Sequence, residues 1–338
     1  KRLNMNELIL KLAQKDGISD ILIQSGLPIS LRINGSIEKL DSQIAKKDLI
    51  NKLIKERLNT AQYKIFNEEG SFDCGFTLKN KRFRANFFKS LNGSNIALRV
   101  IDETVREFND INFPPVIEET LLNRSGLILV TGPTGSGKTT SIAAMLDLIN
   151  QNQQKNIITI EDPIEYIHHP KQSAISQREV GEHTISFASA LRAALREDPD
   201  VILVGELRDL ETVSLALTAA ETGHLVMATL HTSGAANTIN RIIDVFPAEQ
   251  QNQIRSQIAT SLNIAVTQRL IKRLDGDGRV AAFEVMVCNA AIQNLIREGK
   301  IFQIPNLMQT SSGEGMVQMQ QSVDALKADG VINYDEES

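Results

Sequence analysis

The chain has 338 residues, of which 42% are hydrophobic and 23% charged, and its formal net charge at pH 7 is −5. The length predicts about two domains of ordinary globular composition, while the acidic balance argues against a basic nucleic-acid-binding surface. No apolar run reaches the roughly 18 residues of a membrane span, and two cysteines, Cys74 and Cys288, are too few for a disulfide framework or a structural zinc site.

The first hundred residues mix helix and strand patterns. Apolar residues at helical spacing predict helices over residues 5–17 and 46–59. Alternating apolar and polar residues predict strands over 19–40, with a turn at Asn34–Gly35, and three further strands within 71–100. This order predicts a small α+β domain over residues 1–101.

Residues 102–115 are charged, lack a period and end in two prolines, which predicts a linker between domains. From residue 116 onward, short apolar runs alternate with helical patterns. Such runs are typical of strands covered on both faces, and the alternation predicts a parallel sheet with crossover helices. We therefore expect residues 116–338 to form an α/β domain that ends in helices.

A glycine-rich segment, TGPTGSGKTT, joins the first apolar run of the second domain to a helical pattern. It fits the P-loop pattern G-x-x-x-x-G-K-[ST] at each fixed position. In such a loop, backbone N–H groups point at phosphates, Lys138 reaches the β- and γ-phosphates, and the Thr139 hydroxyl binds Mg²⁺. The predicted ligand is ATP with Mg²⁺. The residues expected to bind it are Gly132, Pro133, Thr134, Gly135, Ser136, Gly137, Lys138, Thr139 and Thr140.

Acidic residues follow two later apolar runs. The run VILVGE ends in Glu206, and a glutamate at a strand end is suited to act as general base on the attacking water. The run ITIEDP ends in Glu161 and Asp162, where ligands bind in open α/β sheets, so one of these acids is predicted to hold Mg²⁺. Each pattern is also compatible with an acid in a solvated turn.

Two histidines and two arginines are weaker candidates. His224 and His231 flank the run LVMATL, and His231 is favoured because it follows the strand, where it can sense a γ-phosphate. Arg84 and Arg99 lie on predicted strands of the first domain. Taken alone they indicate a solvated face, although an arginine from outside the P-loop core can stabilise charge on a transferring phosphoryl group.

Five segments together resemble the type II/IV secretion ATPase superfamily, and within it the retraction ATPases of type IV pili. They are GPTGSGKTT, TIEDPIEY, QREVG, LREDPDVILVGELRD and TAAETGHLVMATLHTSGAANTINRIIDVFP. The resemblance implies a PAS-like N-terminal domain joined by a short linker to a RecA-like P-loop ATPase domain. It also implies roles for the candidate residues: Glu206 as catalytic base, Glu161 and Asp162 in an acidic box at Mg²⁺, His224 and His231 in a histidine box, and Arg84 and Arg99 presented to the γ-phosphate.

The same resemblance implies a homohexameric ATP-hydrolysing motor at the cytoplasmic face of the inner membrane, which powers pilus retraction and twitching motility. The implied partners are an inner-membrane platform protein and an accessory retraction ATPase paralogue, with no nucleic acid. The segment AIQNLIREGK is close to the retraction motif, with Gln293 in place of an arginine.

Three alternatives stay open. An assembly or secretion ATPase of the same superfamily usually carries a four-cysteine zinc insertion, which this sequence lacks. The acidic balance argues against a RecA-like nucleic-acid motor. A nucleotide-binding scaffold that does not hydrolyse ATP would have no need of Glu206 as a base.

Overall fold

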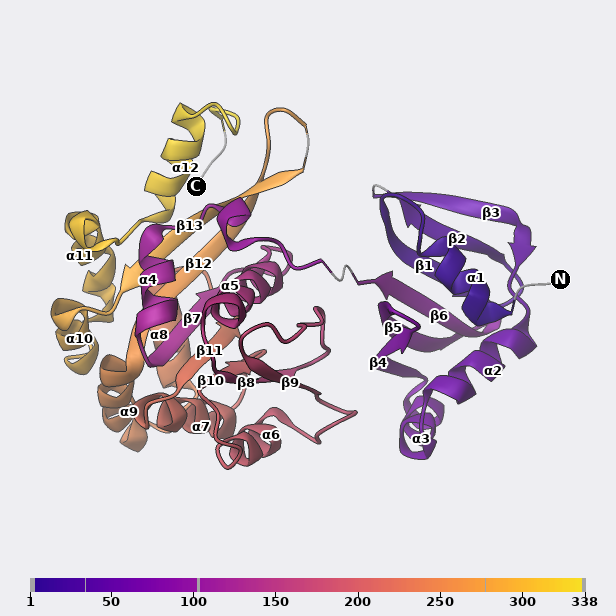
Figure 1. Ribbon diagram of the computed structural model, residues 1–338, viewed down its shortest axis with the longest axis horizontal. Coiled ribbons are helices and arrows are strands. Elements are labelled where there is room, and N and C mark those ends of the chain that lie inside the picture. The colour runs from indigo at the N-terminus through magenta and orange to yellow at the C-terminus, as the bar shows by residue number, and fades with distance from the viewer. Residues whose placement is uncertain (1–3, 34, 102–103, 277, 336–338) are drawn as a thin grey trace. The chain divides into compact units, whose positions relative to one another are not determined.

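The computed structural model describes residues 4–33, 35–101, 104–276 and 278–335 and contains two compact units (Figure 1). The N-terminal unit comprises residues 1–104 and 163–167, and the C-terminal unit comprises residues 105–162 and 168–338. The chain therefore passes between the units three times, after residues 104, 162 and 167. Asn34 of the predicted turn and residues 102 and 103 of the predicted linker lie outside the described residues.

The N-terminal unit is an antiparallel sheet of six strands in the order β3-β2-β1-β6-β5-β4. The strands are β1 (Ile18–Gln24), β2 (Pro28–Ile33), β3 (Ser36–Ile44), β4 (Ser71–Leu78), β5 (Lys81–Ser90) and β6 (Gly93–Val100). The helices are α1 (Met5–Leu12), α2 (Lys47–Arg57) and α3 (Thr60–Glu69). Apolar strand residues such as Ile21, Phe83 and Leu98 form one core with Ile9 of α1 and Ile50 of α2.

The C-terminal unit is built on a seven-stranded sheet in the order β13-β12-β7-β11-β10-β8-β9, parallel except for β13. Its strands are β7 (Gly126–Thr131), β8 (Asn156–Glu161), β9 (Ala174–Glu179), β10 (Val201–Val204), β11 (Leu225–Leu230), β12 (Leu262–Lys272) and β13 (Arg279–Val287). The parallel α/β arrangement predicted from the alternating patterns is confirmed.

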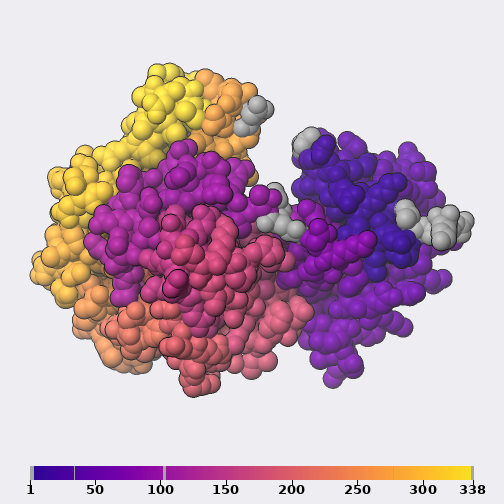
Figure 2. All heavy atoms as spheres, in the orientation of Figure 1, coloured from indigo at the N-terminus to yellow at the C-terminus, as the bar shows by residue number. Residues whose placement is uncertain are grey.

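Helices cover this sheet, and the last of them ends at Ala328. They are α4 (Pro115–Asn123), α5 (Lys138–Asn152), α6 (Phe187–Ala194), α7 (Leu210–Glu221), α8 (Ala235–Asp244), α9 (Ala248–Ser261), α10 (Ala290–Arg297), α11 (Ile304–Thr310) and α12 (Met319–Ala328). Short 3₁₀ turns are η1 (Phe108–Ile111), η2 (Ile301–Gln303) and η3 (Ser312–Glu314). In Figure 2, α12 (yellow) lies over the end of the β12–β13 hairpin (orange), where Val323 and Ile332 pack on Ile271 and Ala282.

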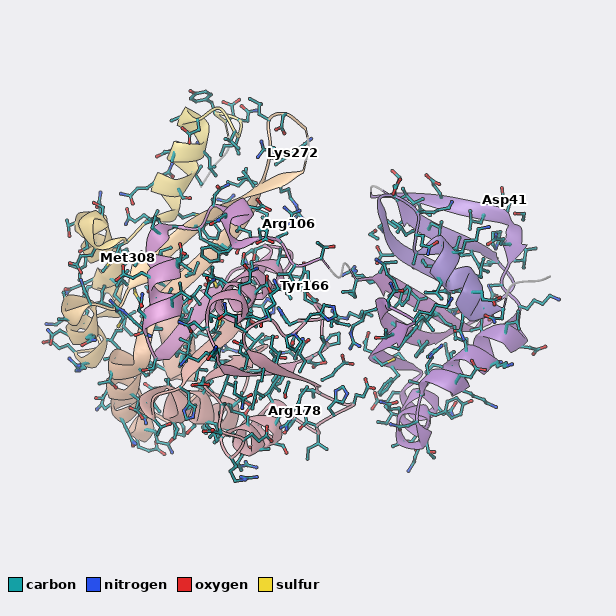
Figure 3. The ribbon with its side chains drawn as sticks, in the orientation of Figure 1. Asp41, Arg106, Tyr166, Arg178, Lys272 and Met308 are labelled. Carbon is teal, nitrogen blue, oxygen red and sulfur yellow. The ribbon has the colours of Figure 1, made fainter. Side chains whose placement is uncertain are left out.

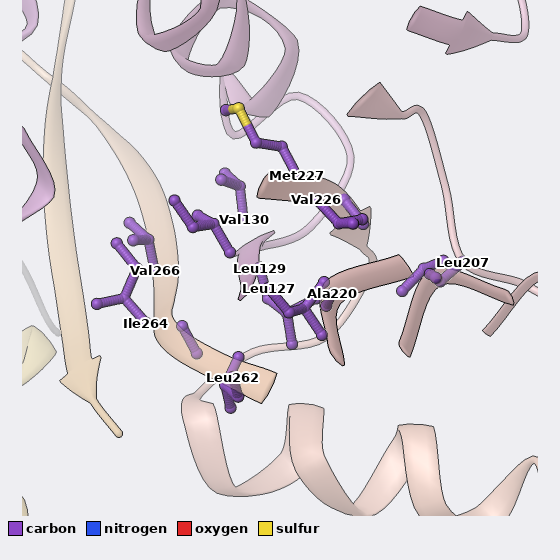
Figure 4. Packing of buried hydrophobic residues seen from close by; sticks show 14 of the residues in the cluster. Leu127, Leu129, Val130, Leu207, Ala220, Val226, Met227, Leu262, Ile264 and Val266 are labelled. Atoms are coloured by element: carbon purple, nitrogen blue, oxygen red, sulfur yellow. The ribbon is translucent and has the colours of Figure 1, made fainter. Parts of the chain in front are cut away.

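The central strands of the C-terminal sheet are buried on both faces, which explains their uninterrupted apolar runs. Figure 4 shows part of this core, with Leu127 and Leu129 of β7, Val226 of β11 and Ile264 of β12 packed together. None of the helices in the described part of the chain has the length and hydrophobicity that crossing a bilayer requires.

Candidate functional site

The carboxyl ends of four adjacent parallel strands meet at one edge of the C-terminal sheet. Thr131, the last residue of β7, pairs with Leu230, the last of β11, while Val204 at the end of β10 pairs with Ile160 of β8. Because ligands bind at this edge in open α/β sheets, the segments that follow these strands form the candidate site. They contain the P-loop, His231, Glu206 and Asp162, and Glu161 is the last residue of β8.

Two of the three P-loop glycines are required by close packing against β12. Gly132 has φ +143°, and a Cβ there would lie 2.5 Å from the Gln268 carbonyl oxygen. Gly137 has φ +88°, and its Cβ would lie 2.9 Å from Gln268 Nε2. The buried Gln268 side chain also accepts a hydrogen bond from Ser141 Oγ (2.6 Å) at the start of α5. Gln268 therefore braces the loop, a role that no motif in the sequence indicates.

Gly132→Ala is expected to lower the free energy of unfolding far more than Gly135→Ala. Both positions have positive φ, which costs about 1–2 kcal/mol for a residue with a Cβ. A Cβ at Gly135 meets no atom within 4 Å, whereas at Gly132 it meets backbone, and such overpacking adds about 1–3 kcal/mol. Urea unfolding of both variants measures the difference, and equal losses would contradict the packing argument.

Lys138 opens α5 and its ammonium group turns back into the loop. The residue is 8% exposed, and Nζ donates to the carbonyl oxygens of Gly132 (2.7 Å) and Pro133 (3.0 Å). Nζ also lies 3.3 Å from His231 Nδ1. The lysine is thus held at the mouth of the P-loop, where the phosphates of a nucleotide are bound in loops of this kind.

Glu206 continues this row of polar side chains. Its Oε2 lies 3.5 Å from His231 Nε2 and 2.6 Å from Arg208 Nη2. Burial raises the pKa of Glu206, but the hydrogen bond and charge of Arg208, aided by His231 and Lys138, outweigh it and hold the pKa below its ordinary value. The carboxylate is therefore ionised at neutral pH, as a general base must be.

A cavity of about 370 Å³ opens beside this row. It is lined by Glu206, Leu207, Arg208, Leu230, His231, Thr232 and Arg241. The lining combines one carboxylate with two arginines and a histidine, so the cavity is suited to an anionic group and a water molecule.

The acidic box lies on the neighbouring strand. Glu161 is 7% exposed, and its Oε1 accepts hydrogen bonds from Thr159 Oγ1 (2.6 Å) and Gln177 Nε2 (3.1 Å). A Cβ at Gly205 would lie 3.3 Å from the Glu161 Cα, so this glycine lets the end of β10 pass close to the box.

The acids fit a magnesium site of limited protein ligation. Among the described residues, no three His, Cys, Asp or Glu side chains cluster as metal ligands. Mg²⁺ keeps several waters and needs only one or two carboxylates besides phosphate oxygens. The Thr139 hydroxyl and the carboxylates of Glu161 and Asp162 are ligands of that kind, and they lie along the carboxyl-end edge of the sheet, with β11 and β10 between β7 and β8.

The structure does not bring His224 to this edge. The residue precedes β11, at the opposite end of the strand from His231. Its Nδ1 lies 2.9 Å from the Ala219 carbonyl oxygen and 3.2 Å from Thr222 Oγ1, which are contacts at the end of α7. We therefore leave His224 out of the candidate site.

Arg84 and Arg99 are direct cross-strand partners in the N-terminal unit. Arg99 Nε lies 3.2 Å from Asp20 Oδ1, and Arg84 Nη1 lies 4.0 Å from Glu165 Oε1. Like charges placed opposite each other destabilise an antiparallel pair. Both side chains are well exposed, and each lies beside a carboxylate of the same unit.

Comparison with known proteins gives consistent matches. Residues 3–297 match the family model described as Type II/IV secretion system protein. The chain is 46% identical over 303 residues to the twitching motility protein of Neisseria gonorrhoeae, covering 89% of this chain and 81% of the relative. It is 44% identical over 326 residues to the type IV pilus retraction ATPase PilT of Pseudomonas aeruginosa, covering 96% and 94%. It also resembles the crystal structure of the pilus retraction motor PilT with bound ADP, with a TM-score of 0.90 and 46% identity over 99% of this chain and 96% of that chain.

Proposed function

This chain belongs to the Type II/IV secretion system protein family, and on that basis we propose that it is an ATP-hydrolysing motor that powers retraction of a type IV pilus. The observation that carries the proposal is the row of Lys138, His231 and Glu206 beside the P-loop. Its supporting context is the similarity, over nearly the whole chain, to a retraction ATPase and to a retraction motor that binds ADP.

In the proposed reaction, the P-loop N–H groups and Lys138 hold the phosphates of ATP. Glu206 accepts a proton from the water that attacks the γ-phosphorus, and the bond to the bridging oxygen breaks to give ADP and phosphate. Bound Mg²⁺ would neutralise charge on the β- and γ-phosphates, with Thr139 and the acids Glu161 and Asp162 as its protein partners. Arg84 and Arg99 stabilise charge on the transferring group.

We further propose a homohexamer at the cytoplasmic face of the inner membrane, acting on a membrane-embedded platform protein with help from an accessory paralogue. A ring assembled head-to-tail suits a nucleotide site that a second, mobile domain completes. Our proposed domain bounds remain 1–101, 102–115 and 116–338.

The retraction assignment also draws on α10, which contains the AIQNLIRE segment. Ile292 and Ile296 are buried in the core of the C-terminal unit. The Gln293 amide donates to the Cys288 carbonyl oxygen (3.3 Å), so glutamine at this position supports the start of the helix. Arg297 and Glu298, at the C-terminal end of this helix, are exposed charged residues.

Arg208→Ala is expected to move the acid limb of the kcat/KM profile to higher pH. Arg208 is what holds the pKa of Glu206 down against burial, so without it the pKa rises and the base is protonated at a higher pH. ATP turnover measured between about pH 5 and 8 tests this. Arg241→Ala, which removes a cation from the same cavity, is the control, and coincident profiles for wild type and Arg208→Ala would refute the role given to Arg208.

Deleting the gene in its own bacterium tests the proposed function. Surplus pili without twitching motility are expected, and complementation with wild type, but not with Lys138→Ala, should restore motility. Loss of all pili would instead favour an assembly ATPase of the same family.

A further inference from the structure

A single side chain of β9 touches both ends of the segment that leaves the C-terminal unit. Gln177 Nε2 donates to Glu161 Oε1 (3.1 Å), and Gln177 Oε1 accepts from the His168 backbone N–H (2.8 Å). Glu161 ends β8, one residue before the departure after Asp162, and His168 is the first residue after the return. Gln177 belongs to the QREVG segment, which marked the family without indicating a role.

The register of β9 against β8 places Gln177 beside Thr159, on the same face of the sheet as Glu161. Gln177 pairs with Thr159 in the parallel β8–β9 ladder, so their side chains share one face, and Glu161, two residues along β8, shares it as well. Thr159 Oγ1 donates to the same oxygen, Glu161 Oε1, that Gln177 contacts. Two donors from neighbouring strands thus contact one oxygen of this buried carboxylate and help to set its orientation.

The intervening segment is held by the N-terminal unit. Residues 163–167 belong to that unit. In Figure 3 the label Tyr166 locates this segment, and the label Arg178 locates β9. The buried Arg82 donates from Nε to the Ile164 carbonyl oxygen (3.0 Å), and the Ile164 side chain is itself buried. The segment is therefore anchored at both ends by Gln177 and in its middle by Arg82.

We propose that Gln177 is a positioning residue, which orients the Glu161 carboxylate toward the magnesium site and ties it to the point where the chain returns from the N-terminal unit. Displacement of residues 163–167 with their unit then acts on the two hydrogen bonds of one amide, and through them on Glu161. The inference rests on the proposed function, because it takes Glu161 to be a partner of Mg²⁺ bound with ATP.

The test is a magnesium titration of ATP turnover in the full-length chain. Gln177→Met, which keeps the side-chain length, and Gln177→Ala are each expected to raise the Mg²⁺ concentration for half-maximal turnover by about 10-fold, as loss of an outer-shell partner typically does. Gln172→Met is the matched control, since Gln172 lies just before β9 and its side-chain amide donates to the Gln151 carbonyl oxygen (2.6 Å), away from Glu161. It should titrate as wild type.

A second comparison separates positioning from a general loss of structure. In a Glu161→Gln background, Gln177→Met should raise the magnesium requirement no further, because a residue that acts through Glu161 has nothing left to position. An unchanged requirement in both Gln177 variants, or a full additive rise in the Glu161→Gln background, would overturn the inference.

Mg²⁺-dependent binding of a fluorescent ATP analogue is measured in parallel. Failure of wild type to hydrolyse ATP would count against the proposed function alone, while a wild-type magnesium dependence of binding in Gln177→Met and Gln177→Ala would count against the role of Gln177.

Discussion

Glu206→Gln is expected to reduce ATP turnover by about 10²–10⁴-fold, the usual contribution of a general base, while nucleotide affinity stays close to that of wild type. Glutamine has nearly the shape of glutamate but does not accept the proton of the attacking water. Lys138, which holds the phosphates, is left in place. Phosphate release at saturating ATP measures turnover, and binding of a fluorescent ATP analogue measures affinity.

The control for this variant is Glu211→Gln. Glu211 is an exposed glutamate in the first turn of α7, paired with Arg192, and the same change of carboxylate to amide there should leave turnover unaltered. If Glu206→Gln kept the turnover of wild type, the general base would have to be another group. If the wild-type protein itself showed no turnover, the non-hydrolysing scaffold would regain support.

Arg84→Gln and Arg99→Gln are each expected to lower turnover by about 10²–10³-fold, the effect of removing one donor from developing transition-state charge. The free energy of unfolding should hold steady or rise by a few tenths of a kcal/mol, because each change removes one of two like charges that face each other across β5 and β6. Loss of activity without loss of stability is the signature of residues placed for binding.

Kinetics and urea unfolding on the same preparations check both parts. Lys39→Gln, which removes an exposed cation from β3 of the same sheet, is the control. Wild-type turnover in both arginine variants would remove them from the site, and a clear drop in stability would show that Asp20 and Glu165 hold the arginines for the fold.

The parts of the site that are marked by a short local sequence pattern were predictable from the sequence. The P-loop spacing, the short apolar runs and the acids that end them are local patterns, and parallel topology then brings Glu206, His231 and Glu161 to one edge. The resemblance to secretion ATPases is confirmed by the family match. The same topology places His224 at the other edge, which a list of motif residues does not reveal.

The parts that depend on strand register were not predictable. Gln268 and Gln177 are uncharged residues in no chemical pattern, and they matter only because β12 packs on the P-loop and β9 pairs with β8. The opposition of Arg84 and Arg99 is likewise a matter of register. Strand β9, with the sequence AISQRE, has no apolar run that would predict it.

Two helical segments illustrate the same limit. Helix α3 buries Phe66 alone, so its amphipathic signal is weak, although Asn59 and Gln62 form a capping box and Gly70 ends it in the left-handed conformation. Within the predicted linker, residues 108–111 form a 3₁₀ turn with Phe108 in the core of the C-terminal unit. Capping residues set the ends of α3 although its apolar pattern is weak, whereas tertiary packing of Phe108 decides the 3₁₀ turn.

The return of residues 163–167 to the N-terminal unit limits where the chain can be cut to make fragments or hybrids with a relative. A fragment ending at residue 104 lacks the Ile164 carbonyl oxygen that accepts from Arg82, and a fragment beginning at residue 105 carries residues 163–167 without the unit to which they belong. A hybrid that takes residues 1–104 from a relative therefore has to keep residues 163–167 compatible with that unit, including Glu165, which lies 4.0 Å from Arg84. The N-terminal structural unit is discontinuous in sequence, so a cut at residue 104 does not separate the two units cleanly.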